Sequence, residues 1–425
     1  MAPRRILAWA LGVAAAAAAL VLLVLPRGAW AAPAADSCTA CHQNLDGPLG
    51  APVAGMRDDV HARRGLTCAS CHGGDPRRAG MDAHDRRAGF VGAPPPQQVP
   101  QFCASCHSRP DVMRRFNPKL PTDQLARYLT SVHGQKLRQG DTQVATCVSC
   151  HGVHPVRGLA DAASPVFAPN VPRTCARCHA DVARMKPYGI ATTQFDEYKE
   201  SVHGRALLER GNRQAPACND CHDNHGAVPP GVTSVANVCA QCHSATRDLF
   251  VRSPHKEAFD VLGQGECTTC HGTHNIAFPT DEMIGGTEPA VCLRCHPAGS
   301  SGSAGASAIR AGLERLKGAI GEAEGLLGRA ERAGMDVSES DLDINEARTQ
   351  LIIARAATHA ASLSAVTPPV QAGVAAAGRA RAVGEAALAE LAFRKRGLFV
   401  ALAVIGFVAL TLWLKLRELE ARHRA

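Results

Sequence analysis

Nine copies of one pentapeptide, C-x-x-C-H, constrain this 425-residue chain more than any other feature of its sequence. Together they use all 18 cysteines. One copy alone would fit a redox dithiol, a zinc site or part of a disulfide framework. Nine copies with no cysteine left over argue against all three. The motifs begin at Cys38, Cys68, Cys103, Cys147, Cys175, Cys218, Cys239, Cys267 and Cys292.

C-x-x-C-H is the covalent attachment site of a c-type haem. Each thiol bonds one vinyl group of the porphyrin, and the adjacent histidine is placed under the iron as an axial ligand. The sequence therefore predicts nine covalently bound haem c groups. The predicted attachment residues are Cys38, Cys41, Cys68, Cys71, Cys103, Cys106, Cys147, Cys150, Cys175, Cys178, Cys218, Cys221, Cys239, Cys242, Cys267, Cys270, Cys292 and Cys295. The predicted proximal iron ligands are His42, His72, His107, His151, His179, His222, His243, His271 and His296.

An internal repeat surrounds these motifs. One unit contains a C-x-x-C-H, a segment ending in S-V-H-G or S-P-H, a second C-x-x-C-H and, three residues later, another histidine. The units span residues 38–84, 103–154, 175–225 and 239–274, and a half-unit at 292–296 follows. Because six of the eight further histidines recur at these places, we interpret the eight as distal iron ligands rather than surface or core residues. These candidates are His61, His84, His133, His154, His203, His225, His255 and His274.

The spacing limits which iron each distal candidate can serve. His154 lies three residues beyond His151, and His225 and His274 are placed alike. Two residues that close emerge on one side of the chain, so they cannot reach opposite faces of one iron. The second histidine would therefore serve a neighbouring haem, which brings haems into close pairs. In the first unit Asp75 takes this place, and His84 comes later in the chain.

The motifs between residues 38 and 296 resemble those of multihaem c-type cytochromes. More narrowly, the doubled C-x-x-C-H units are similar to the class III-like cytochromes of anaerobic respiratory chains. The resemblance implies bis-histidine haems in wire-like arrays that transfer electrons. It also implies redox partners, and we expect a quinol-oxidising membrane subunit among them.

Composition predicts a fold that depends on its cofactors. Aromatic residues make up only 4% of the chain, and the haem region is rich in glycine and proline. We expect a mostly irregular, short-helical cytochrome domain over residues 32–299 whose core is packed by porphyrin. The formal charge is +8. Each bis-histidine ferric haem with ionised propionates contributes about −1, so the loaded protein is close to neutral and no nucleic-acid partner is predicted.

The N-terminus has the pattern of a secretory signal over residues 1–31. Arg4 and Arg5 precede an apolar run from Ile6 to Leu25, and Ala29-Trp30-Ala31 forms a cleavage site of the A-x-A type. The run is also long enough for an uncleaved anchor. Export agrees with the cysteine usage, because c-type haem is attached outside the bacterial cytoplasmic membrane. We therefore predict a periplasmic haem domain.

Short helices are expected to carry some of the distal histidines. The segment from Pro121 to His133 is predicted to be helical, with Leu125, Leu129 and Val132 facing inward and Gly134 ending the helix. Residues 193–203 repeat this pattern. Met113 and Met185 each lie six residues beyond a motif histidine, where the next unit has a leucine. That leucine favours core packing over iron ligation for the two methionines.

After the haem motifs the composition changes. Residues 300–307 form a Gly/Ser/Ala stretch that predicts a linker, and residues 308–392 carry helical periodicity without cysteine. Thr367-Pro368-Pro369 predicts a break before a last, long helix, so we expect an all-α helical hairpin followed by that helix. Because nine haems face only eight distal candidates, His359 is a ninth. Two interpretations stay open: the helix folds back so that His359 supplies the ninth distal ligand, or His359 is a polar residue on an Ala-rich helix.

A C-terminal membrane anchor is predicted at residues 393–416. Its centre, Leu398–Leu414, is free of charge and is flanked by Arg394-Lys395-Arg396 and by Lys415. A buried soluble helix is the alternative, but the chain offers no comparable apolar partner. Both flanks are basic, so orientation follows from export, which places the tail at 417–425 in the cytoplasm. His423 lies in that tail and is expected to be solvated.

The leading functional hypothesis is a membrane-anchored periplasmic electron conduit of anaerobic respiration. It would relay electrons between a quinol-oxidising membrane partner and periplasmic or outer acceptors. The alternative is a multihaem reductase or oxidase of a small nitrogen or sulfur compound, which needs one iron with an open position. No catalytic residue is assigned, because every motif is a plain C-x-x-C-H. A haem filament subunit is a third hypothesis, against which the anchor argues.

Overall fold

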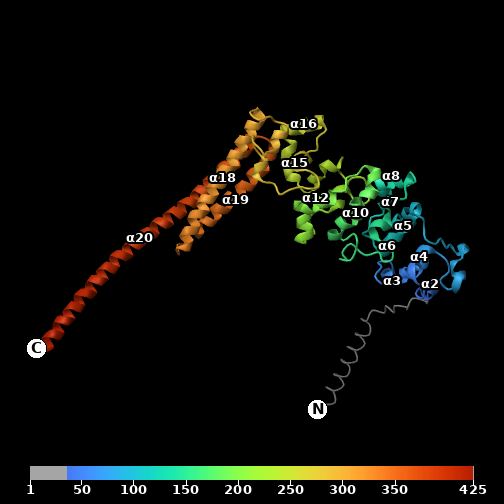
Figure 1. Ribbon diagram of the computed structural model, residues 1–425, viewed down its shortest axis with the longest axis horizontal. Coiled ribbons are helices and arrows are strands. Elements are labelled where there is room, and N and C mark those ends of the chain that lie inside the picture. The colour runs from blue at the N-terminus through green and yellow to red at the C-terminus, as the bar shows by residue number, and fades with distance from the viewer. Residues whose placement is uncertain (1–35, 425) are drawn as a thin grey trace, which may run out of the picture. The chain divides into compact units, whose positions relative to one another are not determined.

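The computed structural model describes residues 36–424, so the predicted secretory signal lies outside the described residues (Figure 1). The described chain is helical and contains no β-strand. This agrees with the expected fold class of short helices followed by an α-helical region. Two compact units are present, divided between Asn170 and Val171. The second unit therefore holds both the later C-x-x-C-H motifs and the long helices.

The first unit consists of short helices joined by turns and 3-10 segments. Several attachment motifs form a single helical turn, and another ends a longer helix. Its α-helices are α2 (Ser37–His42), α3 (Ala51–Met56), α4 (Cys68–His72), α5 (Val99–His107), α6 (Pro110–Phe116), α7 (Gln124–Thr130), α8 (Val132–Arg138) and α9 (Cys147–His151).

The second unit begins with similar short helices and ends with long ones. Its short α-helices are α10 (Val171–His179), α11 (Val182–Met185), α12 (Gln194–Glu200), α13 (Val202–Gly204), α14 (Cys218–His222), α15 (Ser244–Val251), α16 (Pro254–Leu262) and α17 (Thr268–His271). The motifs at Cys239 and Cys292 lie mostly in 3-10 segments, Val235–Gln241 and Val291–Arg294. The long helices are α18 (Ser301–Arg332), α19 (Asp341–Ala357) and α20 (Leu363–Arg424).

The predicted helix before His133 is divided by a serine turn. The hydroxyl of Ser131 donates to the Tyr128 carbonyl at 2.7 Å and accepts from the Gly134 amide at 3.0 Å, so α7 ends and α8 begins there. Gly134 is therefore inside α8 and does not end a helix. It is required for a different reason, because a Cβ at this position would lie 2.0 Å from the Tyr128 carbonyl oxygen. Val132, expected to face inward, is 61% exposed.

Ser201 and Gly204 reproduce this turn in the next repeat. The Ser201 hydroxyl makes the same two hydrogen bonds, at 2.7 Å to the Tyr198 carbonyl and at 3.0 Å from the Gly204 amide. A Cβ at Gly204 would lie 1.9 Å from the Tyr198 carbonyl oxygen. The S-V-H-G sequence thus encodes a tight turn between two helical segments, with the histidine in the first turn of the second segment.

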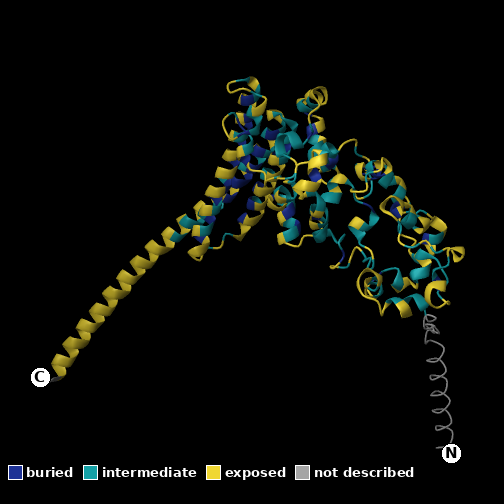
Figure 2. Cartoon of the chain, turned by 45° about the vertical axis from the view of Figure 1, so that its right-hand side comes forward, coloured by how far each residue is buried: buried dark blue, intermediate teal, exposed yellow. Residues whose placement is uncertain are grey.

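The helices α18, α19 and α20 pack as a three-helix bundle around an apolar core (Figure 2). Leu313 and Leu316 of α18 and Val366 and Val370 of α20 are at most 1% exposed. Alanines of α19 and α20, including Ala354, fill the remaining space and let the helices approach closely. This bundle contains the clustered hydrophobic core of the described chain.

Two expectations about this region are wrong. Residues 301–307 are not a linker, because Ser300 caps the helix through the Ser303 amide and α18 begins at once. Ser303 and Ala306 are buried, so tertiary packing overrides the flexible composition. The Pro368-Pro369 pair does not start a helix either, because it lies inside α20, which begins at Leu363.

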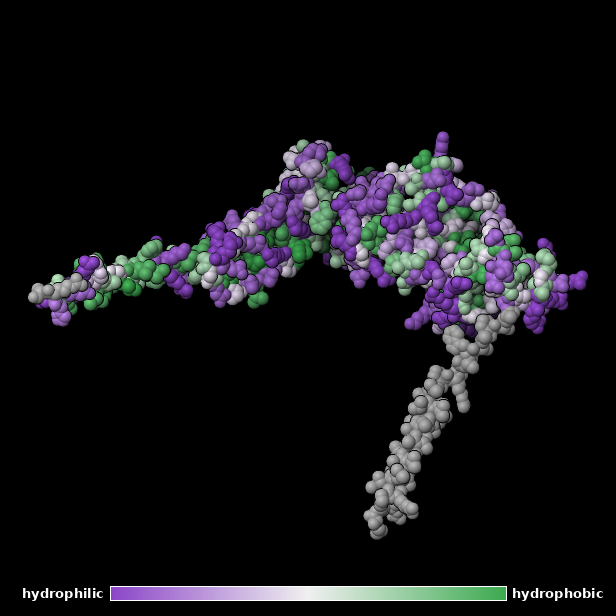
Figure 3. Space-filling view, turned by 60° about the horizontal axis from the view of Figure 1, so that its bottom comes forward, coloured by the Kyte–Doolittle hydropathy of each residue, from purple (hydrophilic) through white to green (hydrophobic). Residues whose placement is uncertain are grey.

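The C-terminal part of α20 leaves the bundle as a single exposed helix (Figures 2 and 3). Within the described residues, α20 is a helix long and apolar enough to cross a membrane, with a mean hydropathy of 2.5 in its apolar window and none of that window buried. The predicted segment 393–416 lies in this part. The helix is therefore compatible with a single-pass membrane anchor.

Candidate haem-binding sites

In seven pairs of histidines, a motif histidine faces a histidine outside the motifs. The ring centroids of each pair are 5.9 to 6.3 Å apart. The pairs are His42 with His84, His72 with His154, His107 with His61, His222 with His274, His243 with His203, His271 with His359, and His296 with His255.

This separation fits an iron held between two imidazoles. A metal–imidazole bond is about 2.0 Å long, and two such bonds on opposite sides of one metal place the ring centres roughly 6 Å apart. Two histidines in direct hydrogen-bonded contact or in a close stack would be nearer to one another. The pairs therefore have the spacing that bis-histidine haem ligation requires.

Hydrogen bonds select the ring nitrogen that is free to bind iron. Nδ1 of His42 donates to the Leu49 carbonyl and Nδ1 of His72 to the Gly92 carbonyl, both at 2.8 Å. A carbonyl oxygen can only accept, so Nδ1 carries the proton and Nε2 keeps its lone pair. His359 is arranged alike, with Nδ1 at 3.0 Å from the Ala356 carbonyl. Such bonds also fix the orientation of the ring.

Burial keeps many of these rings uncharged. It is the main cause that lowers the pKa of seven of them, so the neutral form needed for iron binding is favoured at neutral pH. The neighbouring histidine of the pair lowers several of these pKa values further. The seven are His107, His154, His179, His203, His222, His255 and His271.

Consecutive repeats exchange their distal histidines. In the first unit of the structure, His61 of the first repeat faces His107 of the second, while His154 of the second repeat faces His72 of the first. The third and fourth repeats do the same with His203 opposite His243 and His274 opposite His222. The histidine three residues beyond a motif thus faces a histidine of another motif, as the spacing requires.

The last two motifs complete their pairs differently. His255 of the fourth repeat faces His296 of the half-unit. His359 faces His271, and their ring planes differ by 22°. The helical bundle therefore contributes its histidine where a further repeat would have supplied one. The structure places His359 opposite His271, and its role as an iron ligand stays a prediction.

An ion pair joins the end of α19 to the haem-binding segment. Nε and Nη2 of Arg355, four residues before His359, each donate to one oxygen of the Asp281 carboxylate at 2.8 Å. Lys317 of α18 lies 3.4 Å from the same carboxylate, which is 8% exposed. The Arg355 and Lys317 charges hold the pKa of Asp281 below its usual value. This contact fixes the α19 end beside His271.

His84 is placed opposite His42, although its position in the repeat is irregular. Its ring meets Phe90 edge-on, with centroids 4.7 Å apart. Nδ1 of His84 is buried and has no hydrogen-bond partner. A buried polar nitrogen without a partner is costly, and no group in the described part of the chain satisfies this one.

Four predicted ligands stay as expectations. His151 and His179 are the two attachment histidines outside the seven pairs, and His133 and His225 are the two distal candidates outside them.

Met113 and Met185 are buried, with 7% and 5% of their surface exposed, which agrees with core packing. His423 is exposed at the end of α20, as expected.

The attachment cysteines of consecutive motifs lie next to one another. A hydrogen bond with Cys147 raises the pKa of the Cys103 thiol, and Cys218 acts on Cys175 in the same way. Cys267 and Cys239 form a third such pair. The haem groups held by these motifs would therefore be neighbours in the order in which they occur in the chain.

The links between repeats are electrostatic contacts of the same kind. Burial and, as the smaller cause, the nearness of Cys106 raise the pKa of Cys71, and burial and the nearness of Cys239 do the same for Cys221. Cys292 raises the pKa of Cys270. Within each compact unit, each motif consequently lies close in space to the next one. Electron transfer between adjacent redox groups needs this closeness.

Sequence inspection missed residues that support the histidines from outside. Gly55 of α3 touches the His154 backbone, since a Cβ there would lie 1.9 Å from the His154 carbonyl oxygen. Gly302 leaves room for His296, whose Nδ1 would lie 2.2 Å from such a Cβ. Glycine in a loop-like context gives no signal of such a contact. Asp59, also missed, is treated below.

Comparison with known families agrees with this geometry. Residues 60–180 and 212–297 match the family described as cytochrome c3, and residues 160–244 match cytochrome c7 and related cytochrome c. No curated protein and no solved structure gives a significant match. The two family matches indicate a multihaem c-type cytochrome. They imply covalently bound haem c and support a role in electron transfer.

Proposed function

We propose that this protein is a membrane-anchored periplasmic cytochrome that carries nine haem c groups and relays electrons. Its donor would be a quinol-oxidising membrane partner, and its acceptors periplasmic or outer redox proteins of anaerobic respiration, or the reverse. The observation that supports this proposal best is the set of seven histidine pairs. Each pair would close both axial positions of one iron, which favours electron transfer over binding of a substrate.

The residues of this chain would hold and tune the haems. When bound, haem c supplies one-electron iron(III)/iron(II) chemistry. The cysteines fix each porphyrin to the backbone, and the paired histidines exclude other ligands from the iron. His133 and His225 are the candidates for the irons of His151 and His179. Because consecutive repeats exchange ligands, the haems of His72, His107, His222 and His243 would each tie two repeats together.

The enzyme hypothesis depended on a shortage of distal histidines. If His359, whose ring centroid lies 6.1 Å from that of His271, is a ligand, the shortage no longer exists. No other observation favours an open iron. Electron transfer is therefore the better proposal, and reduction of a small nitrogen or sulfur compound becomes an outcome of the test.

The length of α20 affects which membrane partner is suitable. From Leu363, next to the His359 turn, to Leu398 the helix rises by about 50 Å at 1.5 Å per residue. If the apolar segment spans the bilayer, the iron held by His359 would stand far above the membrane surface along this helix. The partner would then need a redox group carried by a periplasmic domain.

Electron paramagnetic resonance of the oxidised full-length holoprotein tests the proposed function. We expect nine low-spin haems that neither cyanide nor nitrite perturbs. The His359→Ala variant is the positive control, because it should open one iron and produce one high-spin, cyanide-binding haem. A high-spin haem that binds nitrite in the unsubstituted protein would overturn the proposal and support the enzyme.

A further inference from the structure

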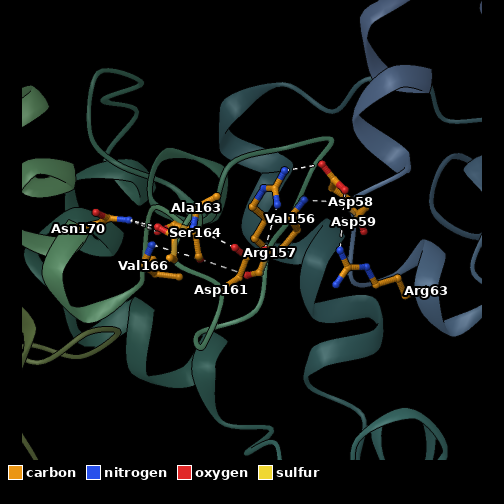
Figure 4. A network of polar contacts seen from close by, with 11 residues as sticks. Asp58, Asp59, Arg63, Val156, Arg157, Asp161, Ala163, Ser164, Val166 and Asn170 are labelled. Carbon is orange, nitrogen blue, oxygen red and sulfur yellow. Dashed lines mark hydrogen bonds and ion pairs between the residues drawn. The ribbon is translucent and has the colours of Figure 1, made fainter. Parts of the chain in front are cut away.

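A buried carboxylate, Asp59, which Figure 4 shows beside Val156, hydrogen-bonds one of the predicted distal histidines. It is 2% exposed. Its Oδ1 accepts from the His61 amide at 2.7 Å and from Nδ1 of His61 at 2.9 Å. Since the same oxygen bonds the backbone and the ring, His61 is fixed in both position and orientation.

The second oxygen of this carboxylate bonds a distant segment. Oδ2 of Asp59 accepts from the Val156 amide at 2.6 Å, although the two residues are 97 positions apart in the chain. Val156 follows His154 by two residues, and the Val60 amide donates back to the Val156 carbonyl at 2.9 Å. Asp59 thus connects the segments of the two histidines that the first and second repeats exchange, His61 and His154.

The carboxylate differs chemically from the partners of three other rings. Nδ1 of His42, His72 and His359 donates to a neutral backbone carbonyl. A hydrogen bond to a carboxylate draws the proton away from the imidazole more strongly and makes the other nitrogen a more basic ligand. A more basic ligand stabilises iron(III) relative to iron(II), because iron(III) carries the larger charge.

We propose that Asp59 is a positioning residue that orients His61 for the haem attached at Cys103 and lowers the reduction potential of that haem. The inference rests on the proposed bis-histidine ligation by His61 and His107. Through this residue the chain would give otherwise similar haems different reduction potentials. With a neutral partner at His61, the haem attached at Cys103 would have a higher reduction potential. With Asp59 it would therefore stay oxidised at potentials that would otherwise reduce it.

The spectrum of this haem should be recognisable. The rings of His61 and His107 cross at 85°, whereas those of His222 and His274 cross at 16°. Perpendicular axial ligands leave two iron d orbitals nearly equal in energy, so the low-spin signal has a larger maximum g value than that of a parallel pair. A redox titration followed at this signal, once its loss in His61→Ala has assigned it, reports on this haem.

The test substitutes Asp59→Asn in the full-length holoprotein. An amide oxygen still accepts from Nδ1, so the low-spin signal should remain, while its midpoint potential should move upward because the charge is gone. Asp58→Asn is the matched control. Asp58 is a neighbouring carboxylate that is 54% exposed and pairs with Arg157 and Arg63, not with a histidine, so its loss should leave the potential nearly unchanged.

Three results would overturn the proposal: an unchanged potential in Asp59→Asn, an equal shift in Asp58→Asn, or a downward shift. If Asp59→Asn fails to load nine haems, Asp59→Glu becomes the deciding variant. It retains the charge, so the potential should stay near the original value, and a rise would contradict the inference. His61→Ala separates this question from ligation, because absence of a high-spin haem in that variant would overturn the ligand assignment itself.

Discussion

The haem-binding residues 36–299 and the bundle of α18, α19 and α20 are stabilised in different ways. In the bundle, leucine, valine and alanine side chains pack against one another and exclude water, as Leu313 and Leu316 show. Among the haem-binding residues, Leu207 is the large aliphatic side chain that is buried to this degree. That region would obtain its apolar volume from porphyrin instead. One chain can thus contain a bundle whose side chains form a complete core and a second region whose core needs bound cofactors.

The strongest test of this contrast prevents haem attachment. Expression of the chain without its export signal should give a protein in which residues 36–299 are largely unfolded, while the bundle keeps its helices. Limited proteolysis with mass spectrometry would show rapid cleavage in the first region and a protected fragment near residues 301–392. Equal protection of both regions would show that the haem domain has a core of its own.

A smaller effect is expected from damage to the bundle core. Leu316→Ala removes a side chain that is 0% exposed, and it should lower the free energy of unfolding of the bundle by about 2–5 kcal/mol. Leu342→Ala is the matched control, since Leu342 is 82% exposed and its loss should cost less than about 0.5 kcal/mol. Thermal unfolding of the holoprotein, followed by circular dichroism, measures both. Similar midpoints for the two variants would contradict the described core.

The two regions meet at the contact between Asp281 and Arg355, which can be broken by itself. In Asp281→Asn the end of α19 should loosen, so that His359 leaves its place opposite His271 in part of the molecules. Electron paramagnetic resonance should then detect a fraction of one haem as high-spin. Arg379→Gln removes an exposed ion pair between α20 and α19, with Asp343, and serves as control. A high-spin signal in the control as well would indicate general loosening of the bundle.

The smallest effect concerns the repeated turns of the haem region. The hydroxyl of Tyr128 donates to the Ala145 carbonyl and that of Tyr198 to the Pro216 carbonyl, both at 2.8 Å. Each carbonyl lies just before the second motif of its repeat. Substitution of either tyrosine by phenylalanine should cost about 1 kcal/mol, with unchanged haem content. Denaturant unfolding measures the loss, and a large difference between the two variants would show that the repeats are not equivalent.

Local sequence determined much of this protein. The C-x-x-C-H motif is continuous, so its attachment chemistry is readable without a structure, and the family matches agree with it. Helical periodicity after residue 308 and the apolar stretch at 398–414 are likewise local, and the structure contains the corresponding helices. These properties depend on residues within a few turns of one another.

The tertiary structure alone decided which distant residues meet. No spacing rule brings His359 to His271 or Asp59 to Val156, because these contacts depend on how whole segments pack. Residues 301–307 show the same limit. Their glycine and serine content predicts a linker, but in the structure Ser300 caps the helix and Ser303 is buried. Local propensity is worth tenths of a kcal/mol to about one kcal/mol per residue, and burial in a packed core exceeds it.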